Sequence, residues 1–267
     1  MASEPLLDTL AELLAGTWDT IKQLVTSEFF LDIVTELLAG TWVTIKLLVV
    51  AAVFGNLLAV PVALARVSHN PLLWIPSYLY ILVMRGTPLL VQLYLIYYGF
   101  GSLFPGIPEI RNSVLWPYLR EGFFYAALAL IVNTAGYSGE ILRGAIQAVP
   151  RGEIEAGRAF GMSKWVIFRR ITLPRAIQIS LPTFSGETIL LLKATALAST
   201  VAITDVLGAA QRLRSEWLRD YPPLIAAAIV YVVLTFGITR VFYWVERRIN
   251  RDRAQPKLAV AAAAAAK

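Results

Sequence analysis

The chain of 267 residues is rich in apolar residues and poor in charge: 57% of its residues are hydrophobic and 16% are charged. Soluble domains of this length rarely have such a composition, which favours a membrane protein. The absence of cysteine excludes disulfides and thiolate metal sites, and the net charge of +6 is segregated by loop, which argues against a nucleic-acid partner.

The first segment, residues 1–33, is predicted to form an amphipathic helix on the outer membrane surface. Its acidic start, with no base in the first 20 residues, argues against a cleavable signal peptide. Residues 12–25 recur almost unchanged at 36–49. The copies differ only at two pairs of positions, Asp19 and Val43, and Gln23 and Leu47. The apolar replacements remove the polar stripe, so the second copy is predicted to insert into the membrane, and we interpret the repeat as a duplication with a packing role.

A helical domain with five transmembrane spans is predicted over residues 34–250, because a bilayer core of about 30 Å requires about 20 apolar residues of helix. This makes the fold all-α and polytopic. The five apolar regions are 38–65, 72–100, 122–144, 176–203 and 222–245.

The distribution of Lys and Arg predicts the orientation of these spans. Bases are concentrated in the loop 143–175 and after the fifth span, whereas bases and acids are equal in number in the loops 102–121 and 204–220. By the positive-inside rule, the N-terminus lies outside and the C-terminus in the cytoplasm. The Ala-rich tail, residues 251–267, is expected to be disordered and is assigned no function.

The second span is interrupted near its middle by Arg85-Gly86-Thr87-Pro88. Pro88 lacks an N–H donor and disfavours helix at Thr87, so a break is expected. We predict that Thr87 N-caps a new half-helix of which Pro88 is the first residue. Its free N–H groups, with Arg85 beside them, predict an anion site that suits an α-carboxylate. The alternative is a proline kink that only shapes packing.

Two acidic residues, Glu140 and Glu187, lie inside predicted spans, where ionisable groups are usually functional. Each is a candidate to pair with Arg85 in the empty transporter and to hold a substrate ammonium group in the loaded one. For Glu140, an intrahelical pair with Arg143, three residues away, is the structural alternative.

The basic loop between the third and fourth spans is predicted to contain two short helices. Pro150 is placed to open the first, Gly161 to cap it in the left-handed conformation, and Ser163 to N-cap the second. One face of the first helix has a small centre that would let a partner approach its backbone. That face consists of Glu153, Ala156, Gly157 and Phe160. The alternative is an ordinary basic loop with capped interfacial helices.

Spacing within this loop carries the main functional signal. Glu155-Ala156-Gly157 precedes Gly161 and, nine residues later, Ile171-Thr172-Leu173-Pro174. This pattern is similar to the E-A-A–x3–G–x9–I-x-L-P loop by which membrane subunits of bacterial ATP-binding-cassette importers hold their ATPase. The third position departs from the pattern, since it is Gly157 rather than Ala, but it stays small. The resemblance implies a coupling role for Glu155, Ala156, Gly157, Phe160, Gly161, Ile171, Leu173 and Pro174.

Three longer segments, 84–99, 133–161 and 171–199, resemble polar amino-acid importer permeases of the histidine/lysine-arginine-ornithine, opine and glutamine group. The resemblance implies a multi-pass protein of the bacterial inner membrane, paired with a similar or identical permease. It also implies two ATPase subunits inside, a periplasmic binding protein outside and an amino-acid substrate. The Glu155 helix would lie in a cleft of the ATPase and convert its closure into alternating access. Arg85, Thr87, Pro88, Glu140 and Glu187 are the predicted pathway residues.

Absent motifs predict a transport subunit without its own enzymatic activity. No G-x-x-x-x-G-K-[ST] sequence occurs, so ATP and Mg²⁺ are expected on a partner chain and no cofactor on this one. No catalytic or metal-binding constellation occurs either. Two other classes stay open: a channel or ion-gradient-driven transporter, which would follow membrane potential rather than ATP, and an intramembrane enzyme.

Overall fold

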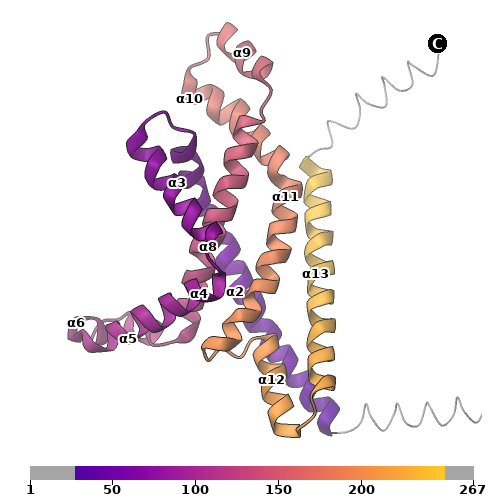
Figure 1. Ribbon diagram of the computed structural model, residues 1–267. Helices are drawn as coiled ribbons and strands as arrows, with labels where there is room; N and C mark the ends of the chain where they lie inside the picture. Colours follow the sequence, from indigo (N-terminus) through magenta and orange to yellow (C-terminus); the bar gives the residue numbers. More distant parts are fainter. Residues whose placement is uncertain (1–27, 250–267) are drawn as a thin grey trace, which may run out of the picture.

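The computed structural model describes residues 28–249. Within this range it is a bundle of helices without strands, arranged around α8 (Figure 1). Of the predicted surface segment, residues 1–33, only 28–33 are described, and they form the first turns of α2. Residues 1–27 and the Ala-rich tail lie outside the described residues. The long helices are α2 (Glu28–Val67), α8 (Gly122–Gln147), α11 (Leu173–Ala194) and α13 (Tyr221–Ile249).

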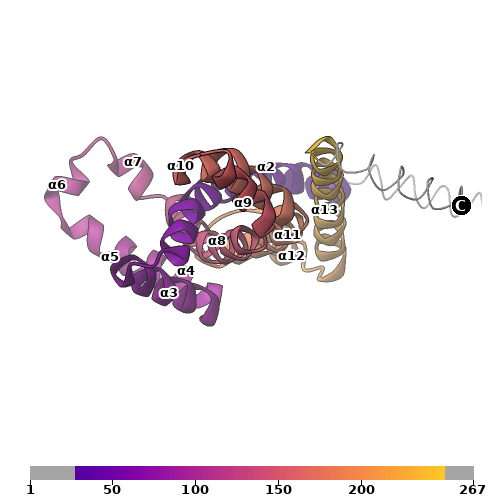
Figure 2. The ribbon, with the colours of Figure 1, turned by 90° about the horizontal axis from the view of Figure 1, so that it is seen from above.

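Shorter helices connect the long ones. They are α3 (Pro71–Gly86), α4 (Leu89–Tyr94), η1 (Leu95–Phe100), α5 (Gly101–Leu103), η2 (Phe104–Gly106), α6 (Pro108–Arg111), α7 (Trp116–Leu119), α9 (Arg151–Ala159), α10 (Lys164–Ile167), η3 (Phe168–Thr172), η4 (Thr195–Val201) and α12 (Val206–Trp217). The segment from α4 to α7 projects sideways from the bundle as an arm (Figures 1 and 2).

Small residues allow α2 and α8 to pack closely. A methyl group on Gly55 of α2 would lie 2.7 Å from Cβ of Thr134 on α8, and one on Gly139 of α8 would lie 3.0 Å from the Val62 side chain. Such contacts between small residues hold membrane helices together, because apolar side chains gain little by leaving lipid. A core cluster that includes Leu47 of α2, Ala126 of α8 and Leu192 of α11 joins the same two helices to α11.

Three helical segments are long and apolar enough to cross a membrane: α2, residues 89–106 and α13. Residues 164–201 and α12 pass the same test together as a pair bent by 47°, which would give a fourth. The predicted second span, 72–100, is not one helix, because α3 ends at Gly86 and the chain becomes helical again at Leu89. The sequence therefore predicted the break correctly but not the sideways course of the second half.

The two ends of the bundle differ in what they carry. The coupling loop (α9 and α10) lies at one end, together with the turn between α2 and α3 and the last turns of α13 (Figure 1). At the other end, α12 lies beside the first turns of α2 and α13. Lys and Arg are thus concentrated at the end that carries α9.

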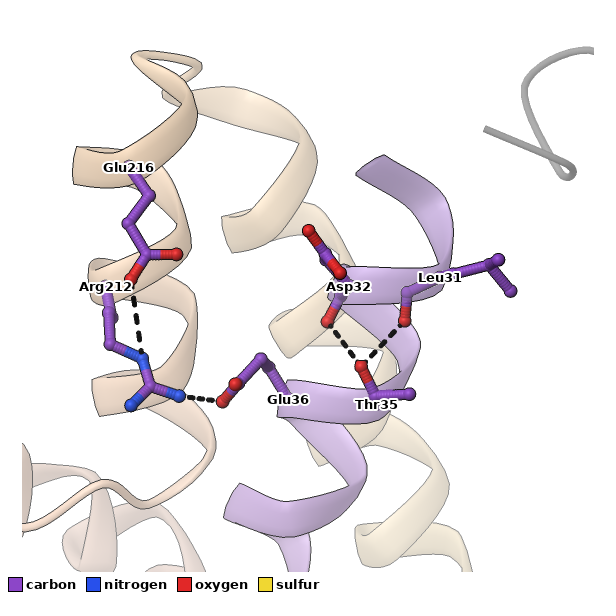
Figure 3. A network of polar contacts seen from close by, with 6 residues as sticks. All are labelled: Leu31, Asp32, Thr35, Glu36, Arg212 and Glu216. Carbon is purple, nitrogen blue, oxygen red and sulfur yellow. Dashed lines mark hydrogen bonds and ion pairs between the residues drawn. The ribbon is translucent and has the colours of Figure 1, made fainter. Parts of the chain in front are cut away.

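Two arginines of α12 are paired with acids. Arg212 bonds Glu36 of α2 and lies 3.9 Å from Glu216 (Figure 3). Arg214 bonds Asp220 at 2.8 Å. The acids that neutralise the arginines of the loop 204–220 therefore include Glu36 on α2, outside that loop.

A buried acid, Asp205, organises the same end. Its carboxylate N-caps α12 by accepting a hydrogen bond from the Gly208 N–H at 2.8 Å, and it accepts another from the Tyr231 hydroxyl at 3.1 Å. The Val206 N–H donates to Thr44 Oγ1 of α2 at 3.2 Å. Gly40 makes this contact possible, since a methyl group there would lie 2.6 Å from the Asp205 carbonyl oxygen.

Gly40→Ala should therefore destabilise the protein by about 1–3 kcal/mol, because neither backbone can yield without moving a helix. Gly237→Ala is the matched control, because a methyl group on Gly237 of α13 meets nothing within 4 Å. The control should be neutral or stabilising by up to about 1 kcal/mol. Thermal unfolding of the purified protein in detergent measures both, and equal unfolding temperatures would contradict the close contact.

Candidate functional site: the coupling loop and the break in the second span

The coupling loop is anchored to the bundle by its inward side. Gly157 of α9 is buried, and a methyl group there would lie 2.9 Å from Cδ1 of Ile171 and 3.1 Å from Cγ1 of Ile167. Ile154 of α9 packs on a small core that includes Ala176 of α11. The helix is therefore fixed against α10, η3 and α11.

The end of α9 has the conformation that the sequence predicted. Gly161 has φ +72°, its N–H donates to the Arg158 carbonyl at 2.9 Å, and the Met162 N–H donates to the Gly157 carbonyl at 3.0 Å. This pair of bonds defines a Schellman cap, for which glycine is the favoured residue. The next helix is N-capped by Ser163, whose hydroxyl accepts from the Val166 N–H at 3.4 Å. At the start of α9, Pro150 is the N-cap residue and Arg151 the first helical residue.

An ion pair that was not predicted from the sequence joins α9 to α11. Arg175 lies 2.7 Å from the Glu153 carboxylate and donates to Gln178 Oε1 at 3.2 Å. The only sequence signal was the position of Arg175 directly after the Ile171–Pro174 pattern. Because Glu153 is held in this way, it is only partly available to a partner.

The prediction that a partner approaches the centre of this face of α9, at Gly157, is therefore wrong. Gly157 points inward and its small size serves packing within this chain, so no partner backbone can approach it. The surface left open on α9 consists of Arg151, Gly152, Glu155, Ala156, Arg158, Ala159 and Phe160. Phe160 is 87% exposed and Trp165 of α10 is 66% exposed. Large aromatic side chains this exposed at a charged helix end are typical of a protein-binding surface.

Gly157→Leu should detach α9 from the isoleucines, because the side chain has no space without moving Ile167 and Ile171. Hydrogen exchange in residues 151–175 should rise about tenfold or more, since a loss of roughly 1.4 kcal/mol of local stability changes the opening equilibrium by that factor. Ala156→Leu, on the exposed side of the same helix, should leave exchange unchanged. Equal exchange in the two variants would show that α9 is not held by this contact.

The break in the second span also differs in detail from the prediction. Thr87 is the C-cap of α3, not the N-cap of the next helix: its N–H and its hydroxyl both donate to the Val83 carbonyl, at 3.1 and 2.7 Å. Pro88 is the N-cap of α4, which begins at Leu89 and whose cap has no side-chain hydrogen bond. The physical reason is that the Thr87 hydroxyl bonds back into the helix it ends.

The charged residues near the break form two groups. Glu140 makes a bidentate pair with Arg143 on the same helix, at 2.6 and 2.9 Å, as the structural alternative for Glu140 requires. The Arg85 guanidinium lies 5.4 Å from the centre of the Tyr137 ring and interacts electrostatically with Glu140 and Glu187. Among residues 28–249, the Glu187 side chain makes no ion pair or hydrogen bond. Glu187 is therefore the better placed of the two acids to act with Arg85.

Two further polar residues at the break were missed. Gln92 of α4 is 6% exposed and bonds the end of α3, and Asn133 of α8 bonds Gln92. Their signal in the sequence was an amide within an apolar run, which in a membrane helix indicates a partner or a pathway.

Comparison with known proteins identifies the family of the chain. Residues 30–251 match the family described as binding-protein-dependent transport system inner membrane component. The chain is 44% identical to the octopine transport system permease protein of Rhizobium radiobacter over 76% of this chain and 83% of that one. It is 40% identical to the histidine/lysine/arginine/ornithine transport system permease protein of Salmonella typhimurium over 73% and 82% of the two chains.

Solved structures show the same fold. The crystal structure of an amino acid ABC transporter with histidines matches with a TM-score of 0.71 and 32% identity, over 84% of this chain and 99% of that one. An inward-facing methionine ABC transporter matches with a TM-score of 0.68 at 21% identity, over 84% and 99% of the chains, which supports the fold alone.

A helical membrane domain with a docked loop helix at its basic end is the architecture of a transport subunit. The chain belongs to the family of inner membrane components of binding-protein-dependent transport systems.

Proposed function

We propose that this chain is the permease subunit of an ATP-binding-cassette importer that carries a polar, basic amino acid or opine across the bacterial inner membrane. The observation that carries the proposal is the coupling loop: α9 is fixed to α11 on one side and presents Glu155, Ala156 and Phe160 on the other. Family membership and the names of the relatives support the class of cargo.

The proposed topology has five crossings, an outer N-terminus and a cytoplasmic C-terminus. Its support is the basic end of the bundle, which carries α9 and the last turns of α13, and the paired arginines at the opposite end. The crossings are formed by α2, by α3 with α4, by α8, by α11 with η4, and by α13.

The proposed complex contains a second permease of the same or a similar sequence, two ATPase subunits and a periplasmic binding protein. This chain contains no Walker motif, so the ATPase subunits bind ATP and Mg²⁺. Each permease offers one α9, so two permeases match two ATPases. The exposed Phe160 and Trp165 fit the part of the loop that would contact the ATPase.

Alternating access follows from the way α9 is held. Movement of the ATPase against α9 passes through the Gly157–Ile171 contact and the Glu153–Arg175 pair into α11. Because α11 carries Glu187 and packs on α8, a shift of α11 changes the surroundings of Arg85. The energy of ATP binding is thereby spent on moving the helices that line the pathway.

Substrate chemistry suits Arg85 and Glu187, neither of which makes an ion pair among residues 28–249. Arg85 would bind the α-carboxylate and Glu187 the ammonium group of an amino acid, while Tyr137 stacks against the Arg85 guanidinium. Glu140 is paired with Arg143, so it affects the electrostatic potential near Arg85 but does not contact the substrate directly.

The direct test is reconstitution of the chain with its ATPase, binding protein and permease partner in liposomes. Uptake of labelled histidine, arginine or octopine should require ATP and the binding protein. Uptake that follows membrane potential and ignores ATP would instead establish a channel or an ion-gradient-driven transporter.

Glu155→Lys should abolish uptake and substrate-stimulated ATP hydrolysis while this chain still folds, because the exposed carboxylate is reversed without disturbing the inward contacts of α9. Glu109→Lys, on the arm, makes the same exposed change away from α9 and should transport normally. Gly161→Arg should act like Glu155→Lys, since a side chain at φ +72° disrupts the cap. Assembly and transport at the normal rate in the Glu155 and Gly161 variants would refute the coupling assignment.

Arg85→Ala should lower uptake about tenfold or more, the effect of losing one charge-assisted hydrogen bond of roughly 1.5–3 kcal/mol. Assembly and the affinity of the binding protein for substrate should stay unchanged. A loss of assembly would make Arg85 a structural residue.

A further inference from the structure

Pro88 leaves a carbonyl group without its usual partner. In a continuous helix, the N–H of residue 88 would donate to the carbonyl of Met84, but proline has no N–H. A carbonyl left unpaired inside a membrane domain costs several kcal/mol, so a replacement donor is expected.

Side-chain amides from two other helices supply that donor. The Gln92 amide nitrogen donates to the Met84 carbonyl at 3.0 Å, and the Asn133 amide nitrogen donates to the same carbonyl at 3.2 Å. Gln92 also donates to the Thr87 carbonyl at 3.2 Å and to Thr87 Oγ1 at 2.8 Å. Its own carbonyl oxygen accepts from Asn133 at 3.0 Å. The two amides therefore connect the end of α3, the start of α4 and the middle of α8.

The backbone of α8 is shaped for this contact. A methyl group on Gly136 would lie 2.6 Å from Cβ of Met84, so only glycine at this position lets α3 come close enough for Asn133 to reach the Met84 carbonyl. Nearby, the Tyr80 hydroxyl donates to the Val132 carbonyl and joins the same two helices. The end of α3 is thus fixed in position by contacts on either side of Asn133.

We infer that Gln92 and Asn133 are positioning residues that set the bend between α3 and α4 and thereby place Arg85 for substrate. Arg85 directly follows Met84, and its guanidinium lies over Tyr137, one helical turn beyond Asn133 on α8. A change in the bend moves Arg85 relative to Glu187. This role rests on the proposed transport function, since it concerns the geometry of the pathway and not substrate contact by the amides.

Gln92→Met and Asn133→Leu test the inference, because each keeps a side chain of similar size and removes the donor. Gln211→Met is the matched control: it makes the same chemical change on α12, where Gln211 is exposed and its side chain has no hydrogen bond among the described residues. Thr87→Val, which removes the hydroxyl that accepts from Gln92 and donates to the Val83 carbonyl but leaves both amides in place, is a milder variant in case the first two fail to fold.

The first readout is the bend itself. The chain contains no cysteine, so spin labels on cysteines at Leu79 of α3 and Leu103 of α5, both exposed, report the distance across the break. Pulsed electron paramagnetic resonance is measured on the labelled full-length chain in nanodiscs, diluted with unlabelled chain. The distribution of label-to-label distances should be narrow for the natural sequence and for Gln211→Met. Gln92→Met and Asn133→Leu should shift or broaden it, and Thr87→Val should do so to a smaller degree.

The second readout is the number of substrate molecules taken up per ATP hydrolysed by the reconstituted complex. It should fall about tenfold in Gln92→Met and Asn133→Leu, the usual scale for losing hydrogen bonds to a buried group, while ATP hydrolysis continues. Purely structural damage would reduce hydrolysis as well. The double variant should lose more than the two single variants together, because each amide alone still donates to the Met84 carbonyl and only the double variant leaves it without a donor.

An unchanged distance distribution in both variants, or a shifted distribution with normal uptake per ATP, would overturn the inference. If the natural sequence moves no amino acid at all, the proposed function fails. The distance measurement then still shows whether the amides hold the bend.

Discussion

The structure depends on the close contact of Gly157 with Ile167 and Ile171. This contact turns a short loop helix into a fixed part of the bundle, because no side chain stands between the α9 backbone and the isoleucines. A helix that swung freely would absorb movement of a partner rather than transmit it. Packed groups transmit displacement because interiors are dense and resist compression.

The loop at the basic end and the break in the second span are stabilised in different ways. At the basic end, the Schellman cap at Gly161 and the pair between Glu153 and Arg175 make the loop rigid. At the break in the second span, Pro88 removes a backbone bond and side chains replace it. Side-chain bonds can rearrange without unfolding a helix, so the break in the second span can bend more easily than the loop that contains α9.

Much of this was predictable from the sequence where local chemistry decides the outcome. The left-handed Gly161, the Ser163 cap and the break after Arg85 follow from residue types alone. The inward orientation of Gly157 was not predictable, because it depends on isoleucines ten and fourteen residues away. The predicted role of Thr87 was wrong: Thr87 caps the end of α3 rather than the start of α4, because its hydroxyl donates to the Val83 carbonyl. Gln92 and Asn133 were missed because their connection spans two helices far apart in the sequence.

Cross-linking from position 160 tests the central claim most directly. In a Phe160→Cys variant, which carries the only cysteine of this chain, a short bifunctional reagent should link the permease to its ATPase in membrane vesicles. An impermeant thiol reagent should reach the residue only from the cytoplasmic face. Labelling from the outside, or no link in a complex that transports, would contradict the account.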